Sequence, residues 1–325
     1  MQRLTFVVRE VRQASPLICS IRMVLASGDP LPAFGPGAHV KVHVPGIDEP
    51  RSYSLVQTDA DAGAFAAPTE YRLGVRRDDA GGGGSRYMHT LKVGDTLEAE
   101  GPKNDFVLHE EPAGEPAAIL IAGGIGITPL ASMCAALTAA GRAYDFHYCG
   151  RSLEQLAFRD ELAALAGDAL HLHPDDDASC AFDLNAILDA ASPHQHLYVC
   201  GPKGLIDAVI AAAHARHWPD AHVHFELFSA PAPLAGDQPF EVELRDSGMV
   251  LTVPADRTIV DVMEEAGCDP MVDCKRGECG VCQADVIDGI PDHRDYYLSD
   301  TEKASGKVIQ ICISRAKSAR LVLAL

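Results

Sequence analysis

Four of the ten cysteines in this 325-residue chain are spaced in a way that fixes what its C-terminal part has to build. Cys274, Cys279 and Cys282 form the pattern C-x4-C-x2-C, and Cys312 follows further along. This is the spacing of plant-type [2Fe–2S] sites, in which four thiolates hold two irons. We predict that these cysteines are the cluster ligands and that Cys312 arrives from a strand over Val308–Ile313.

Two glycines inside the cysteine loop, Gly277 and Gly280, fit this prediction. A glycine lets backbone N–H groups approach the sulfurs, and such hydrogen bonds tune the reduction potential. A structural zinc site is the competing interpretation, but zinc sites usually combine C-x2-C with a second close pair. Cys312 has no such neighbour, which favours the cluster.

The start of the chain and its apolar runs favour a cytoplasmic protein without a membrane partner. No stretch reaches the ~18 apolar residues of a membrane span, and residues 1–6 lack a signal-peptide core. The formal net charge of -19 argues against nucleic acid or an anionic membrane as a partner, because both select a basic surface. Solubility explains the acidity, and steering toward a basic redox partner is the alternative.

Hydrophobic patterning predicts a multidomain protein. The first hundred residues alternate short β-rich runs with Pro and Gly, which predicts an antiparallel β-barrel or sandwich. These runs are Thr5–Val11, His39–Val44, Tyr71–Val75 and Thr96–Glu100.

From about Ala117, apolar strands alternate with helical stretches, which predicts an α/β domain with a parallel sheet. The Pro- and Ala-rich segment Ser229–Gln238 resembles a semi-stiff linker. An α+β domain of the β-grasp type is expected after it. We therefore divide the chain into residues 1–105, 110–228, 229–238 and 239–325.

Two glycine-rich turns predict a dinucleotide site in the α/β domain. The strand Ala118–Ala122 runs into Gly-Gly-Ile-Gly-Ile-Thr-Pro, where Thr128 is suited to cap a helix and Pro129 to its first position. A second apolar strand ends at Cys200 and is followed by Gly201 and Pro202. Two such turns at the carboxyl ends of parallel strands would frame one crevice. Ordinary strand-to-helix turns and a buried core thiol at Cys200 are the simpler interpretation.

These motifs together resemble the phthalate dioxygenase reductase family over essentially the whole chain. The resemblance implies, in order, a flavin-binding, a NAD-binding and a ferredoxin domain. It implies a flavin site at Arg51-Ser52-Tyr53-Ser54, Gly74-Val75-Arg76 and Gly83-Gly84-Ser85. It implies a NAD site at Gly124, Gly126, Thr128, Pro129, Cys200, Gly201 and Pro202, and it places Phe228 beside the flavin. Ser54, Cys200 and Phe228 are then the residues expected near the flavin and nicotinamide.

The sequence and the resemblance both bear on which flavin and which nicotinamide nucleotide the chain binds. The resemblance favours FMN over FAD. NADH is favoured over NADPH because Asp175-Asp176-Asp177 would repel a 2′-phosphate and accept ribose hydroxyls. Arg151 and Ser152, after the preceding strand, are the counter-argument, although in this family their position contacts NADH. A solvated acidic loop is the simpler interpretation of the three aspartates.

The expected activity is electron transfer from NADH through FMN and the [2Fe–2S] cluster to the oxygenase component of a Rieske-type system. We expect no acid–base dyad or nucleophile, and we interpret His171, His173, His222 and His224 as strand faces. The docking face is expected around the cluster, with Lys275 and Arg276 exposed. The alternatives are a reductase of a haem or diiron oxygenase, and an electron carrier with a regulatory nucleotide domain.

Overall fold

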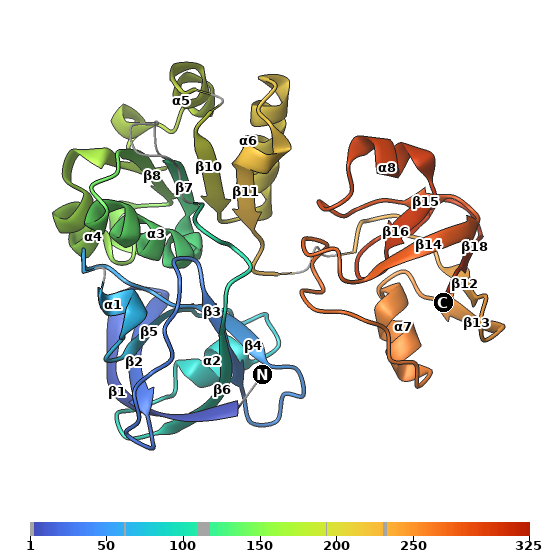
Figure 1. Cartoon of the computed structure of the whole chain (residues 1–325), viewed down its shortest axis with the longest axis horizontal. Helices are drawn as coiled ribbons and strands as arrows, with labels where there is room; N and C mark the ends of the chain where they lie inside the picture. The colour runs from blue at the N-terminus through green and yellow to red at the C-terminus, as the bar shows by residue number, and fades with distance from the viewer. Residues whose placement is uncertain (1–2, 62, 110–117, 193, 230–232) are drawn as a thin grey trace. The chain divides into compact units, whose positions relative to one another are not determined.

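The computed structural model describes residues 3–61, 63–109, 118–192, 194–229 and 233–325 (Figure 1). The chain divides into two compact units, Met1–Glu226 and Leu227–Leu325. Within the described ranges, no helix is both long enough and apolar enough to cross a membrane.

The first part of the N-terminal unit is an antiparallel β-barrel. Its six strands are ordered β4-β3-β6-β1-β2-β5, and an antiparallel bridge between Leu55 and Leu73 joins the two outer strands. Phe6, Ile21 and Met23 lie inside the barrel, each at most 1% exposed. Of the two predicted architectures, barrel and sandwich, the structure has the barrel. The elements are β1 (Arg3–Ser15), β2 (Ile18–Leu25), β3 (His39–His43), β4 (Arg51–Ser54), α1 (Gly63–Ala66), β5 (Tyr71–Arg76), α2 (Gly84–Met88) and β6 (Thr96–Lys103).

The second part of this unit is the predicted parallel sheet, ordered β11-β10-β7-β8-β9. Helices α3 and α4 lie on one face and α5 and α6 on the other (Figure 1), so all six residues of β7 are buried. The elements are β7 (Ala118–Gly123), α3 (Ile127–Ala139), β8 (Tyr144–Gly150), α4 (Arg159–Ala166), β9 (Leu170–Pro174), α5 (Leu184–Ala190), β10 (His196–Cys200), α6 (Lys203–Ala215) and β11 (Val223–Glu226), with 3-10 turns η1 (Gly124–Gly126), η2 (Leu153–Gln155), η3 (Gly167–Ala169), η4 (Ala178–Cys180) and η5 (Asp220–His222).

The C-terminal unit is an α+β domain built on a mixed sheet, ordered β13-β12-β18-β14-β16. Strands β12 and β18 run parallel, whereas β12 and β13 form an antiparallel pair. Helix α7 begins with a capping box between Thr258 and Asp261. The elements are β12 (Phe240–Leu244), β13 (Met249–Val253), α7 (Ile259–Glu265), β14 (Gln283–Asp288), β15 (Pro291–Asp292), α8 (Asp300–Ser305), β16 (Val308–Gln310), β17 (Arg315–Ala316) and β18 (Arg320–Leu323).

The last residues of the predicted linker are bound to this C-terminal unit. Arg294 grips the Asp237 carboxylate through two nitrogens, at 2.8 and 2.6 Å, and Arg315 donates to the Gln238 carbonyl at 3.1 Å. The hydrogen bond from Arg294 lowers the pKa of Asp237 to about 2. Residues 230–232 of the same segment lie outside the described residues.

Histidines gather at two places on the parallel sheet. On β8 and β9, the rings of His147 and His173 are linked at 3.0 Å. On β10 and β11, His196 Nδ1 and His224 Nε2 lie 2.6 Å apart, and the His224 ring stacks 4.6 Å from Tyr198. Burial and neighbouring histidines lower the pKa of His147 and of His224 to about 3.

These two histidines make the stability of the N-terminal unit pH-dependent. Their pKa is lower in the folded state than the ~6.5 of an unfolded histidine. The stability they confer is therefore complete above pH ~6.5 and is lost as pH falls toward 3. Between pH 7.5 and 5 each contributes a loss of up to about 2 kcal/mol, which urea denaturation across this range measures.

The variant His224→Gln removes one of these titrations and should make the slope of stability against pH less steep. His214→Gln, on an exposed part of α6, is the matched control and should leave the slope unchanged. An unaltered slope in His224→Gln would contradict the assignment.

Candidate functional site

Two segments distant in sequence meet on the barrel at the predicted flavin site. Arg51 and Tyr53 come from β4, and Gly84 begins α2. A Cβ added at Gly84 would lie 2.9 Å from Arg51 Cγ and 3.5 Å from the Tyr53 hydroxyl. Gly83, which precedes the helix, has φ 93°, and only glycine adopts this conformation without strain. The structure thus brings Arg51, Tyr53 and the glycine turn together.

Arg51 lies against the glycine turn, where it suits a phosphate. A Cβ on Gly82 would lie 3.1 Å from an Arg51 guanidinium nitrogen. A cation beside a turn that offers backbone N–H groups is a suitable arrangement for an anion. Ser85, the last of the predicted flavin residues in this turn, also closes the turn. Its hydroxyl accepts from the Asp78 N–H at 3.0 Å.

The remaining predicted flavin residues frame the same region. Burial raises the pKa of Tyr53 to about 12, so its phenol stays neutral. Ser54 is buried, whereas Ser52 is exposed on the same strand. On β5, Gly74 and Val75 are buried and Arg76 is exposed. Strand β4 thus contains both exposed and buried residues, whereas in β5 only Arg76 is exposed. A flavin could therefore contact side chains of β4 and mainly the backbone of β5.

The two predicted nucleotide turns lie side by side. Strands β7 and β10 are parallel neighbours, with Ala122 opposite Cys200, so both turns leave the same edge of the sheet. A Cβ on Gly126 would lie 2.1 Å from the Cys200 carbonyl oxygen, and one on Gly201 would lie 2.9 Å from the Gly123 Cα. The two backbones touch, as the prediction of a shared crevice requires.

The predicted role of Thr128 as a helix cap is wrong. Helix α3 begins at Ile127, and Gly126 occupies the capping position. Thr128 is 1% exposed, and its hydroxyl donates to the Ile125 carbonyl at 3.1 Å. Its methyl group faces the barrel, because a Cβ on Gly74 would lie 2.7 Å from it. Pro129, predicted at the first helical position, is instead the third residue of α3, where it is buried.

The residues predicted to select the nucleotide lie on neighbouring strands of this edge. Arg151 and Ser152 follow β8, and Asp175 follows β9. The Asp175 N–H donates to the Gly150 carbonyl at 2.8 Å, which joins the two segments. Asp177 accepts from the Ser179 N–H and caps η4. Of the three aspartates, Asp175 is the one placed next to the β8 turn, and it is exposed.

Phe228 belongs to a different compact unit from the predicted flavin and nucleotide residues. It is 40% exposed and belongs to the C-terminal unit. The predicted contact of Phe228 with the flavin therefore stays a prediction.

The four predicted cluster ligands are in mutual contact. The Cys274 thiol interacts with those of Cys279 and Cys312, and Cys312 also interacts with Cys282. Hydrogen bonds from Cys279 and then Cys312 lower the pKa of Cys274, and one from Cys312 lowers that of Cys282. Four grouped cysteines are the donor set that a plant-type [2Fe–2S] cluster requires.

The loop around these thiols depends on two glycines. Gly277 has φ 78° and Gly280 has φ 74°. A Cβ on Gly277 would lie 2.3 Å from Ile313 Cδ1, and one on Gly280 would lie 2.3 Å from the Tyr297 ring. The loop also presents the Arg276 N–H to the Cys274 sulfur at 3.3 Å. The predicted hydrogen bonding to sulfur is thus present, and the glycines have a packing role that the sequence did not reveal.

Two expectations about the cluster region are wrong. Strand β16 ends at Gln310, so Cys312 lies in the following turn rather than in a strand. Arg276 is not exposed either. It pairs with Glu278 at 3.2 Å, and both side chains are 14% exposed. Lys275 pairs with Glu264 at 3.0 Å.

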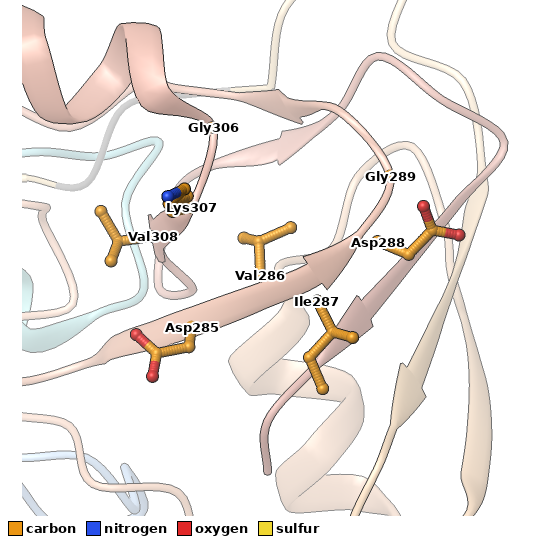
Figure 2. Close-up of a pocket in the computed structure, with 8 residues that line it drawn as sticks. All are labelled: Asp285, Val286, Ile287, Asp288, Gly289, Gly306, Lys307 and Val308. Atoms are coloured by element: carbon orange, nitrogen blue, oxygen red, sulfur yellow. The ribbon is translucent and has the colours of Figure 1, made fainter.

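A pocket in the C-terminal unit lies away from all the predicted site residues. Figure 2 shows it between the end of β14 and the start of β16, with Asp288 and Lys307 among its lining side chains. None of the four cysteines lines it. We therefore assign it no cofactor.

Sequence reasoning missed the residues that join the barrel to the sheet. The Ser132 hydroxyl on α3 donates to the Leu55 carbonyl at 2.7 Å. Glu161 on α4 accepts from Arg72 on β5, with Nη2 to Oε1 at 2.9 Å. No local pattern could identify these contacts, since each joins positions more than seventy residues apart.

Replacing Gly280 with alanine should prevent the cluster from assembling. The new methyl group would overlap the Tyr297 ring at 2.3 Å, in addition to the ~1 kcal/mol that a positive φ costs. Iron and acid-labile sulfide content should fall by more than half. Gly267→Ala is the matched control because Gly267 has φ 81° with nothing within 4 Å. Equal iron content in both variants would contradict this packing role.

Replacing Gly126 with alanine should weaken NADH binding by about tenfold or more, because the methyl group would force apart the two nucleotide turns. Gly204→Ala, in the first turn of α6, meets nothing within 4 Å and should bind NADH normally. The dissociation constant from fluorescence titration is the measurement. Unchanged affinity in Gly126→Ala would remove this crevice from the nucleotide site.

Three family patterns match successive parts of the chain. The oxidoreductase FAD-binding domain matches residues 6–108, the oxidoreductase NAD-binding domain residues 120–210, and the 2Fe-2S iron-sulfur cluster binding domain residues 242–317. The chain is thus an oxidoreductase with flavin, NAD and [2Fe–2S] domains. These matches confirm the predicted fold class and cofactor types.

Full-length relatives agree. Vanillate O-demethylase oxidoreductase of Pseudomonas sp. strain HR199 is 40% identical, with 98% of each chain covered. Phthalate dioxygenase reductase of Burkholderia cepacia is 38% identical over 94% of this chain and 92% of that protein.

Solved structures extend the likeness. Phthalate dioxygenase reductase matches with a TM-score of 0.70 and 36% identity, over 99% of this chain and 98% of that chain. An intact type IV self-sufficient cytochrome P450 monooxygenase matches with a TM-score of 0.73 and 35% identity, but this chain spans only 41% of its length. The chain belongs to the phthalate dioxygenase reductase family of flavin- and NAD-dependent iron–sulfur oxidoreductases.

Proposed function

We propose that this chain takes electrons from NADH onto FMN and passes them singly, through its own [2Fe–2S] cluster, to a separate Rieske-type oxygenase component. The observation that carries the proposal is the set of four thiols in mutual contact, in one chain with a flavin barrel and a nucleotide sheet. When bound, the flavin accepts a hydride and the cluster carries one electron at a time. An oxygenase partner is common to the named relatives.

The chain's own residues bind and orient the cofactors. Arg51 and the Gly82–Gly84 turn would hold the flavin phosphate, and Tyr53 would cover the ring system. The remaining proposed flavin contacts are Ser52, Ser54, Gly74, Val75, Arg76 and Ser85. The proposed dinucleotide contacts are Gly124, Gly126, Thr128, Pro129, Arg151, Ser152, Asp175, Cys200, Gly201 and Pro202, and Phe228 is proposed to close the site.

FMN is proposed from the resemblance to the phthalate dioxygenase reductase family, and guanidinium nitrogens of both Arg51 and Arg86 lie beside the Gly82–Gly84 turn, where they suit a phosphate. NADH is proposed because Asp175, exposed beside the β8 turn, would repel a 2′-phosphate and accept ribose hydroxyls. We also keep the domain limits 1–105, 110–228 and 239–325 as proposals. A cytoplasmic location is proposed, because NADH is supplied there.

A haem oxygenase is the second candidate for the partner. It is favoured by the self-sufficient cytochrome P450 monooxygenase, in which a region 35% identical to this chain is part of the same polypeptide. The Rieske-type partner is favoured by the resemblance to phthalate dioxygenase reductase over nearly the whole length of both chains. In either case the final substrate binds to the oxygenase component and not to this chain.

Replacing Cys312 with serine should separate the two electron acceptors. Cytochrome c, reduced one electron at a time through the cluster, should lose more than nine-tenths of its rate. Ferricyanide reduction by NADH, which needs only the flavin, should persist. Stopped-flow and steady-state assays of both acceptors measure this.

Cys268→Ser is the matched control. Cys268 lies in the same unit, and its thiol contacts Met249 Sδ at 3.9 Å rather than the cluster thiols. Both activities should survive in this variant. Equal loss of both activities in Cys312→Ser would contradict the proposed electron order.

A further inference from the structure

The carboxylate of Glu161 on α4 is held entirely by the flavin-binding barrel. Its Oε2 accepts from the Thr58 hydroxyl at 2.8 Å and from Arg72 Nη1 at 2.5 Å. Its Oε1 accepts from Arg72 Nη2 at 2.9 Å and from Arg12. The nucleotide-binding sheet therefore presents one anion to a socket of three barrel side chains.

Arg72 is committed to this contact by burial and geometry. It is 6% exposed, and its Nε donates to the Ser20 hydroxyl at 2.8 Å. A buried guanidinium is costly unless it is paired and hydrogen-bonded, and the two-pronged contact with Glu161 meets both needs. The hydrogen bond from Arg72 lowers the pKa of Glu161 to about 2, so the pair stays charged at neutral pH.

Phe158, one helical turn before Glu161, connects this ion pair to the flavin strand. Its φ of 60° is in the left-handed region, where a bulky residue is strained and must be held by its surroundings. The Arg72 guanidinium lies 4.6 Å from the centre of its ring. On the other side, a Cβ on Gly74 would come within 3.1 Å of the ring and 2.7 Å of the Thr128 methyl.

A second contact fixes α3 near the same place. The Ser132 hydroxyl donates to the Leu55 carbonyl at 2.7 Å and accepts from the Gln57 N–H at 2.9 Å. Leu55 directly follows β4, which carries the proposed flavin residues Arg51 and Tyr53. Both flavin strands are thus bound to the helix that follows the first nucleotide turn, or to its neighbour α4.

We propose that the Arg72–Glu161 ion pair is a positioning clamp: it sets the approach of the nucleotide turn to strand β5 and thereby the rate of hydride transfer from NADH to flavin. This inference rests on the proposed function. The transfer breaks a C–H bond of the dihydronicotinamide and moves two electrons and one proton together to the flavin. Such a step is sensitive to misplacement, and a shift of about 1 Å can slow it about 100-fold.

The test uses the full-length holoprotein and three substitutions. Glu161→Gln keeps the shape and removes the charge. Arg72→Lys keeps the charge but cannot contact both oxygens in the same fork. Asp160→Asn is the matched control, because Asp160 is on the same helix, pairs with adjacent Arg159 at 2.9 Å, and has a side chain 85% exposed.

The first measurement is anaerobic flavin bleaching by NADH and by its deuterated form in single turnover. Glu161→Gln and Arg72→Lys should slow this step about 10- to 100-fold and increase its isotope effect, while Asp160→Asn matches wild type. The second is the long-wavelength charge-transfer absorption of the reduced protein with NAD⁺, which reports nicotinamide–flavin contact without turnover. It should weaken in the first two variants only.

A role confined to stability would lower the unfolding midpoint and leave the isotope effect and the charge-transfer band unchanged, and that result would overturn the clamp. Should Glu161→Gln not fold, Thr58→Val removes one hydrogen bond from the same carboxylate with both charges kept. It should slow bleaching roughly threefold or more, and a wild-type rate there would equally reject the clamp. If wild type itself is not bleached by NADH, the proposed function fails instead.

Discussion

Each of the proposed sites depends on a glycine that lies so close to a neighbouring group that a Cβ would not fit between them. Gly126 lies against the Cys200 carbonyl, Gly74 against Thr128, and Gly280 against the Tyr297 ring. These contacts are steric and do not depend on any bound cofactor. The nucleotide turns, the flavin strand and the cluster loop therefore keep their shape because the glycine at each contact leaves room for the neighbouring carbonyl, methyl group or ring.

Charge has a different place in each unit. Between barrel and sheet, Arg72 and Glu161 form a hydrogen-bonded pair with the arginine buried. In the C-terminal unit, Arg294 binds both oxygens of Asp237. Surface pairs contribute little to stability, so we expect removing a charge to have structural consequences at these two partly buried pairs and at Arg276–Glu278, where both side chains are 14% exposed. The acidity of the chain as a whole, with net charge -19, is carried by other residues.

Patterns within one segment were predictable, and contacts between segments were not. The four thiols followed from spacing alone, and the parallel sheet followed from alternating apolar strands and helices. In strand β2, Ser20 and Arg22 interrupt the apolar run, and the burial of Ser20 as a partner of Arg72 is visible only in the folded structure. Helix α4 starts only at Arg159, because Phe158 before it is held in the left-handed region by packing against distant residues. Thr128 was assigned to a cap by composition, whereas its methyl group faces Gly74.

The division of the chain between Glu226 and Leu227 places the proposed flavin site and the cluster cysteines in two units of one polypeptide. Leu227, the first residue of the C-terminal unit, donates its N–H to the Glu278 carboxylate within that unit. Electron transfer from flavin to cluster is then an intramolecular step, for which effective concentrations reach the order of millimolar. Reduction of the cluster by the flavin should therefore proceed at the same rate at any dilution of the protein, and a free ferredoxin would have to be present at millimolar levels to compete for those electrons.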